Sequence, residues 1–222
     1  MFYDLFFNPN HLSAEQASIY GIETRPELVT RSQELASKAQ FAGMQFLNLS
    51  VADSIESDLL PEQVDIVTAL HACNTATDDA IRFALAKQAE HIVLVPCCQA
   101  EVASVLRQHK NQHKANYLME LWRHPIHTRE FGSHLTNVLR CLQLQAHGYQ
   151  VSVTELVGWE HSMKNELIIA SKTANKTQTS GNTDNYARVQ YNRPAGERLD
   201  ELLQTFGLES LQERFFLPSD LR

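Results

Sequence analysis

The sequence predicts an α/β protein built on a doubly wound sheet that is mostly parallel and ends in an antiparallel strand. Short apolar runs alternate with helical segments over residues 18–146, which is the pattern of βαβ units. The last two apolar runs, residues 150–157 and 166–171, are separated by eight residues. So short a connection cannot hold a crossover helix, and we expect these two strands to be antiparallel neighbours.

The first half of the chain supplies four expected strands and two expected helices. Pro26 lies near the first turn of one helix and Gly43 lies just beyond its end, as helix boundaries prefer. The second helix should be capped by Thr77 and Asp78. Pro96 stops the fourth strand. The expected strands are residues 18–23, 45–49, 64–70 and 91–95, and the expected helices are residues 26–41 and 77–89.

The second half is less regular. A helix rich in Gln, His and Lys begins near residue 100 and passes into an irregular stretch, before another helix over residues 128–146. A short helix over residues 197–206 precedes an apolar tail, residues 215–217, that should pack against the body. We therefore expect a main domain at residues 1–172, a polar linker or loop at residues 173–196, and a C-terminal helix and tail at residues 197–222.

Composition narrows the class of protein. The 222 residues are 43% hydrophobic, enough for one domain with a substantial core. The net charge of −7 gives no global attraction to nucleic acid or anionic membrane, although a local basic groove remains compatible with it. Four cysteines form no CxxC pair, and no apolar stretch approaches the roughly 20 residues of a membrane span. We expect a soluble, cytoplasmic protein.

Two acidic residues follow successive expected strands. Glu23 ends the first strand, where a carboxylate can accept the hydroxyls of a ribose in doubly wound folds. Its alternative is a solvated glutamate beside a helix start. Asp53 follows the second strand, where it can accept the exocyclic amine of an adenine, or serve only as a turn aspartate. Each placement supports the other, because both lie about 30 residues apart at the same kind of strand end.

Further polar groups follow the third and fourth strands. His71, Asn74 and Asp78 could meet a substrate or the sulfur of a cofactor, and a helix cap made by Thr77 and Asp78 is compatible with that role. Cys97 and Cys98 are adjacent, which makes a shared metal site less probable than small pocket-lining residues. No metal ligand set is expected. The segment 159–165, which includes Lys164 and Asn165, is a dense set of hydrogen-bonding groups for a turn.

Taken together, these residues resemble a known family. Glu23, Asp53 and three segments, residues 71–78 (HACNTATD), 96–99 (PCCQ) and 160–165 (EHSMKN), are similar to those of class I methyltransferase-like proteins. The similarity covers roughly residues 18–172, with the three segments in the expected order. Asn74 stands where the family pattern has Asp, and Ser162-Met163 also departs from it.

The resemblance implies a Rossmann-like sheet of seven strands with an antiparallel last strand, and S-adenosyl-L-methionine as cofactor. It places Glu23 on the ribose and Asp53 near the adenine. The expected sites are cofactor-binding Glu23, Asp53, His71 and Ala72, weakly catalytic His71 and Asp78, and a substrate pocket of Asn74, Pro96, Cys97, Cys98, Gln99, Lys164 and Asn165. The methyl acceptor is not identified by the resemblance.

The front of the chain departs from this family. None of the eight glycines forms the glycine-rich turn that follows the family's first strand, and residues 2–7 look like the end of the next helix. We therefore expect the first strand to be missing and this chain to bind the cofactor poorly by itself. The main hypothesis is a methyltransferase. The rival is a non-catalytic binding or scaffold protein with the same fold, and a nicotinamide-dependent oxidoreductase explains fewer of the segments.

Overall fold

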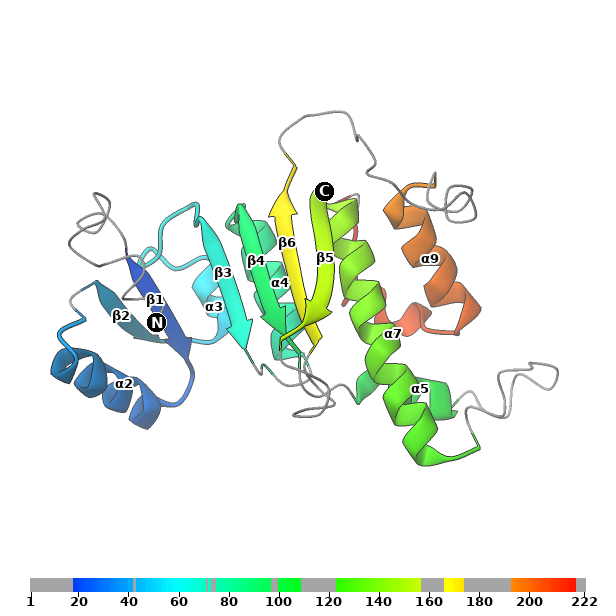
Figure 1. Ribbon diagram of the computed structural model, residues 1–222, viewed down its shortest axis with the longest axis horizontal. Helices are drawn as coiled ribbons and strands as arrows, with labels where there is room; N and C mark the ends of the chain where they lie inside the picture. Colours follow the sequence, from blue (N-terminus) through cyan, green and yellow to red (C-terminus); the bar gives the residue numbers. More distant parts are fainter. Residues whose placement is uncertain are drawn as a thin grey trace. The chain divides into compact units, whose positions relative to one another are not determined.

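A computed structural model describes residues 18–41, 43–70, 72, 75–96, 100–108, 123–156, 166–173 and 193–218 (Figure 1). It divides into two compact units, Met1–Glu62 and Gln63–Arg222. Each unit is an α/β arrangement with its own sheet, so the two are described separately below. The expectations about residues 2–7 and a missing first strand concern a segment outside the described residues.

The first unit contains a two-stranded parallel sheet. Strands β1 (Ile19–Glu23) and β2 (Met44–Asn48) pair in register over their whole length, and α2 (Pro26–Lys38) connects them. Pro26 at the start of α2 has no amide hydrogen to leave unsatisfied, which suits a first helical position. A five-residue helix that the sequence did not predict, α3 (Val51–Ile55), follows β2.

The first unit has a small core. Its buried hydrophobic residues are Val29, Ala36 and Leu60, whereas every side chain of β1 and β2 is half-buried or exposed. A sheet of two strands is marginal without further packing partners. This unit therefore gains little stability from apolar burial within its own described residues.

The second unit contains a four-stranded sheet in the order β3 (Ile66–Leu70), β4 (His91–Val95), β6 (Glu166–Lys172) and β5 (Tyr149–Glu155). Strands β3 and β4 are parallel, and β6 runs antiparallel to both β4 and β5. The predicted antiparallel pair beside residues 91–95 is thus confirmed. Strand β6, which follows β5 in the sequence, lies inside this sheet, and β5 lies at its edge.

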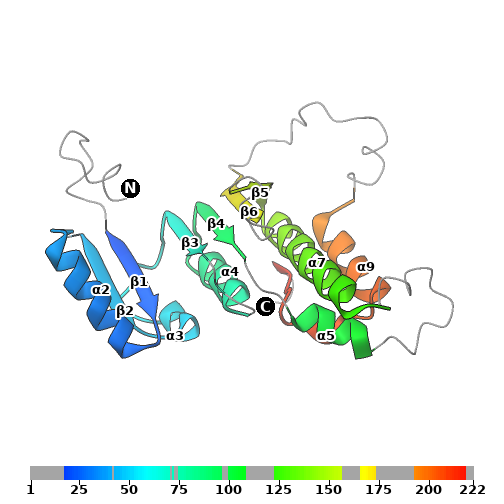
Figure 2. The same cartoon turned by 60° about the horizontal axis from the view of Figure 1, so that its bottom comes forward.

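Helices cover one face of this sheet. Helix α4 (Ala76–Ala86) connects β3 to β4, while α5 (Glu101–Gln108) and α7 (Pro125–Ala146) precede β5 (Figure 2). The register places Val67, Ile92 and Ala170 in one row across the sheet, and all three are buried. The neighbouring row begins with Ile66, which is 45% exposed. The core therefore lies between the buried rows and the helices.

The C-terminal residues complete the core of the second unit. Helix α9 (Ala195–Thr205) packs against α7, and a 3-10 turn (Glu209–Leu211) leads into the tail. Phe215 is 1% exposed and belongs to a cluster with residues of α5, α7 and α9. The predicted docking of the apolar tail is confirmed. Residues 174–192 of the expected linker lie outside the described residues.

Two local expectations were wrong. Helix α7 begins at Pro125 rather than residue 128, because proline suits the first helical position. Helix α4 begins at Ala76 after Thr75, which makes no side-chain cap, and neither Thr77 nor Asp78 caps it. Their side chains have partners elsewhere, which the next subsection describes.

No helix among the described residues is long and apolar enough to cross a membrane.

Candidate functional site at the strand ends

The first candidate position is the carboxyl edge of the two-stranded sheet. Because β1 and β2 are parallel and in register, Glu23 and Asn48 lie side by side at that edge. The Asn48 Nδ2 group donates to the main-chain carbonyls of Glu23, at 3.0 Å, and Thr24, at 2.9 Å. The amide therefore fixes the chain where it leaves β1 and positions the Glu23 side chain.

The Glu23 carboxylate is held ionised by its neighbours. Arg25 donates to Oε1 from Nε and from its backbone N–H, and to Oε2 from Nη2, each at 3.1 Å. These side-chain and backbone bonds from Arg25 lower the pKa of Glu23 to about 2. The Glu23 side chain is 32% exposed. Since Oε2 accepts one of these three bonds, it keeps a lone pair for a further hydroxyl donor.

An open hollow lies beside Glu23, between β1 and α2. Its volume is about 550 Å³ and its walls mix apolar and polar side chains. At Gly21 a Cβ atom would come within 2.5 Å of the Phe46 ring, so a side chain there would have to displace that ring. The lining residues are Gly21, Ile22, Glu23, Leu28, Arg31, Ser32, Leu35 and Phe46.

Asp53 has a local partner and does not line this hollow. Ser50 caps α3: its Oγ accepts from the Asp53 backbone N–H at 3.0 Å and donates to Asp53 Oδ2 at 2.6 Å. Ser50 thus caps the helix, and its hydroxyl also fixes the Asp53 side chain. Asp53 therefore lies in the first helical turn of α3 with a local structural partner, rather than in a connecting turn, and contact with an adenine stays a prediction.

Most candidate residues of the second unit fall on segments that the structure leaves undescribed. Ala72, Asp78 and Pro96 are described, and Pro96 is buried directly after β4. The candidates outside the described residues are His71, Asn74, Cys97, Cys98, Gln99, Lys164 and Asn165.

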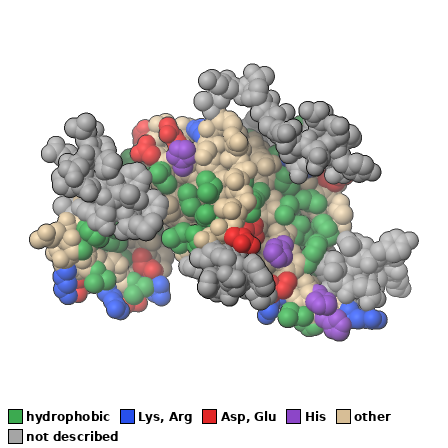
Figure 3. Space-filling view, in the orientation of Figure 1, with side chains coloured by type: hydrophobic (Ala, Val, Ile, Leu, Met, Phe, Trp, Pro, Cys, Tyr) green, Lys and Arg blue, Asp and Glu red, His purple; other side chains and the backbone are tan. Residues whose placement is uncertain are grey.

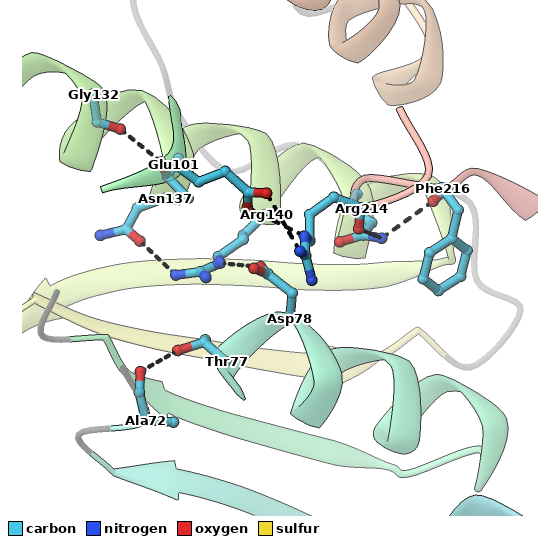
Figure 4. A network of polar contacts seen from close by, with 11 residues as sticks. Ala72, Thr77, Asp78, Glu101, Gly132, Asn137, Arg140, Arg214 and Phe216 are labelled. Carbon is cyan, nitrogen blue, oxygen red and sulfur yellow. Dashed lines mark hydrogen bonds and ion pairs between the residues drawn. The ribbon is translucent and has the colours of Figure 1, made fainter. Parts of the chain in front are cut away.

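Asp78 points into the core rather than toward the sheet edge (Figure 4). Its Oδ1 accepts from Arg140 Nε at 2.6 Å, and the two side chains are 6% and 0% exposed. Burial raises the pKa of the Asp78 carboxyl, and Arg140 opposes the rise. A carboxylate enclosed in this way has no access to an acceptor. The weak catalytic expectation for Asp78 is therefore replaced by a structural role in joining α4 to α7.

The ion pair extends into a chain of polar contacts. Arg140 Nη1 donates to Asn137 Oδ1 at 3.3 Å, and Asn137 Nδ2 donates to Glu166 Oε2 at 2.8 Å. Glu166 opens β6, directly after the segment that holds Lys164 and Asn165. At the other end of this series of polar contacts, Asp78 belongs to α4, which follows the segment that holds His71 and Asn74. The network thus anchors the borders of two candidate loops.

A hydrogen bond to a residue before the helix also fixes the first turn of α4. Thr77 Oγ1 donates to the Ala72 carbonyl at 2.6 Å, across the turn that precedes the helix (Figure 4). This bond ties the loop after β3 to the helix that follows it. Arg140 and Asn137 were missed by sequence reasoning, although both interrupt the apolar pattern of residues 128–146 and so could have been recognised.

Neither thiol nor metal chemistry is evident in the described part of the chain. Burial raises the pKa of the Cys141 thiol to about 12, so this cysteine is a poor nucleophile. Within the described ranges, no group of three or more His, Cys, Asp or Glu side chains could hold a metal ion.

Comparison with known protein families gives a match to the front half of the chain. Residues 2–105 match a family described as a methyltransferase domain. The matched range includes Glu23, Asp53, His71 and Pro96 and ends within α5. No curated protein matches the chain. The front half of the chain is therefore similar to methyltransferase domains, and the candidate segment 160–165 lies beyond the match.

Proposed function

We propose that this protein is a methyltransferase that uses S-adenosyl-L-methionine. The observation that carries the proposal is Glu23, an ionised and partly exposed carboxylate at the carboxyl edge of parallel strands. It lies within the range that matches methyltransferase domains. Ligands of doubly wound folds bind at this edge, and an acidic residue there accepts hydrogen bonds from ribose hydroxyls.

The residues of the first unit fit the nucleoside part of such a cofactor. Glu23 would accept from the ribose hydroxyls, with Arg25 keeping the carboxylate charged and oriented. Asp53 would accept from the adenine amine while Ser50 fixes its side chain. When bound, the cofactor would supply a methyl group on a sulfonium sulfur: the acceptor's lone pair would form the new bond, sulfur would keep the old bonding pair, and the acceptor's proton would pass to His71.

The acceptor pocket is assigned to the segments after β3 and β4 and before β6. Binding and exclusion of water by Asn74, Pro96 and Lys164 would supply most of the rate enhancement, because in-line displacement depends chiefly on positioning. We assign the acceptance of a proton to His71 and leave Asp78 out, since its carboxylate is paired with Arg140 inside the core. Cys97, Cys98, Gln99 and Asn165 complete the proposed pocket.

Calorimetric titration with S-adenosylhomocysteine tests the proposal without knowledge of the acceptor. Glu23→Gln should weaken binding by roughly tenfold to hundredfold, since hydrogen bonds to a charged group contribute about 1.5–3 kcal/mol. The control Glu34→Gln removes one negative charge from the exposed side of α2 and should leave binding unchanged.

The titration also separates the proposal from its rival. A folded wild-type protein that takes up no S-adenosylhomocysteine even at high ligand concentration would favour the non-catalytic scaffold, because the sequence leads us to expect weak binding rather than none. Equal binding by wild type and Glu23→Gln would refute the ribose assignment even if the cofactor binds. Circular dichroism of each variant shows whether the fold is retained.

A further inference from the structure

Positive charge is concentrated in one part of an acidic chain. The protein has 19 Lys and Arg residues against 26 Asp and Glu residues. Residues 107–129 reverse this balance, with five Lys or Arg and a single acid, and they contain four of the ten histidines. A local excess of positive charge in a protein with net charge −7 points to an anionic partner for this part of the chain.

The described residues of this segment form a basic surface, defined as Arg107, Arg123, His124, His127 and Arg129. All five side chains are exposed. Figure 3 shows His and Lys or Arg side chains gathered over the start of α7. Glu130, which pairs with Arg129 at 3.0 Å, is the acid next to this surface in sequence. Residues 109–122 lie outside the described residues and are not included.

Packing brings the two helices of the basic surface together. At Gly132 of α7 a Cβ atom would lie 2.8 Å from the backbone nitrogen of Ala103 in α5, so the two helices touch there. Arg107 is one helical turn beyond Ala103, and Arg129 is nearly one turn before Gly132. The guanidinium groups therefore come from the end of one helix and the beginning of the other.

The basic surface lies toward the end of the second unit at which the parallel strands finish. Helix α7 leads directly into β5, and β5 points the same way as β4 because both run antiparallel to β6. The helix must therefore run opposite to β4, and its first residues lie at the end of the unit where β3 and β4 terminate (Figure 1). This is the edge at which doubly wound folds bind their ligands.

We propose that the basic surface binds single-stranded nucleic acid, and that nucleic acid is the methyl acceptor. Arginine forks match phosphate oxygens, and exposed guanidinium and imidazole planes can also stack on unpaired bases. The rings of His124 and His127 meet edge to face, with centroids 5.3 Å apart, which orients them in different directions. Unpaired bases offer these planes a stacking partner that the carboxylates of an acidic peptide lack. The acceptor part of this inference rests on the proposed function.

The expected binding is modest and depends on salt. Three arginine–phosphate contacts would give a slope of about −2 for the logarithm of affinity against the logarithm of salt concentration. Between about 50 and 200 mM salt, that slope corresponds to roughly a twentyfold loss of affinity.

Fluorescence anisotropy with a labelled single-stranded oligonucleotide, in RNA and DNA forms of one sequence, tests the surface. The full chain should bind at low salt, and the R107Q/R123Q/R129Q variant should bind at least tenfold more weakly, with the salt slope reduced by about 2. The control K38Q/K172Q/R193Q removes the same charge at exposed positions elsewhere and should stay within about twofold of wild type.

Several outcomes would overturn the inference. Absence of binding at low salt, equal loss in both triple variants, or equally strong competition by polyglutamate would each exclude a nucleic-acid surface here. Titration of the same variants with S-adenosylhomocysteine measures cofactor binding independently of oligonucleotide binding. If the oligonucleotide binds and the cofactor product does not, the surface stands, while the acceptor assignment fails together with the proposed function.

Discussion

Replacing Asp78 by Asn should strongly destabilise the second unit. The substitution keeps the shape of the side chain but removes the carboxylate that pairs with the Arg140 guanidinium, which is 0% exposed. Removing one partner of a buried ion pair typically costs about 3–5 kcal/mol. For a unit of this size each kcal/mol lowers the melting temperature by about 2–4 °C.

The reverse substitution, Arg140→Met, should respond to pH in a way that Asp78→Asn does not. Burial raises the pKa of Asp78 above its ordinary 3.8, and Arg140 opposes that rise. Without Arg140 the folded-state pKa rises further, so the folded protein binds the proton more tightly than the unfolded chain. Stability then increases as pH falls. The loss caused by Arg140→Met should be smaller at about pH 5 than at about pH 8, while the loss caused by Asp78→Asn should change little.

The single variant Asp78→Leu and the double variant Asp78→Leu/Arg140→Met complete a thermodynamic cycle with Arg140→Met. With neither charge buried, the double variant should recover most of the stability lost by the single variants, because an apolar pair of similar size often replaces a buried ion pair at little cost. Urea unfolding followed by circular dichroism measures the stability of each variant. A loss below about 1 kcal/mol for Asp78→Asn, or additive losses in the double variant, would refute a strong buried pair.

Three further outcomes follow from single positions. Gly132→Ala should lower the free energy of unfolding in urea by about 1–3 kcal/mol, because the new methyl group collides with the α5 backbone at 2.8 Å. The control Gly196→Ala should be nearly neutral, because its nearest neighbour is a side chain at 3.4 Å. Arg25→Gln should raise the pKa of Glu23 from about 2 toward its ordinary 4.5 in a carboxyl-resolved NMR titration, and an unchanged pKa would contradict the assigned cause. Cys141 should resist alkylation in the folded protein near pH 8 and react after unfolding, as judged by peptide mass spectrometry, because a pKa of about 12 leaves on the order of one thiol in 10⁴ ionised.

The sheet was largely predictable from sequence because its signals are local. Residues 91–95 form an apolar run that ends at a proline, and they are the observed β4. The antiparallel pair followed from the length of one connection, which no tertiary contact can alter. Helix α3 escaped prediction because its five residues carry no periodic pattern, and only the Ser50 cap marks its beginning.

The polar interior was not predictable in the same way. Thr77 and Asp78 fit the preferences of a helix start, yet their side chains bind Ala72 and Arg140 instead. Arg140 is 62 residues away from Asp78 in the chain, so nothing local to either residue reveals the pair. Glu23 differs from Asp78 because its partner, Arg25, is only two residues away. Its position at the end of a strand could therefore be predicted from the local sequence.

The position of β6 inside the sheet has a consequence for how the protein is made. Translation produces β4 and β5 before β6, but in the finished sheet these two strands touch only through β6. In a nascent chain that stops short of Glu166, β4 and β5 are therefore not joined to each other. The cluster around Phe215 cannot form until α9 and the residues after it are synthesised. Contacts so distant in sequence slow folding. During that interval the growing chain would be a natural client of ribosome-associated chaperones, which bind transiently exposed apolar strands.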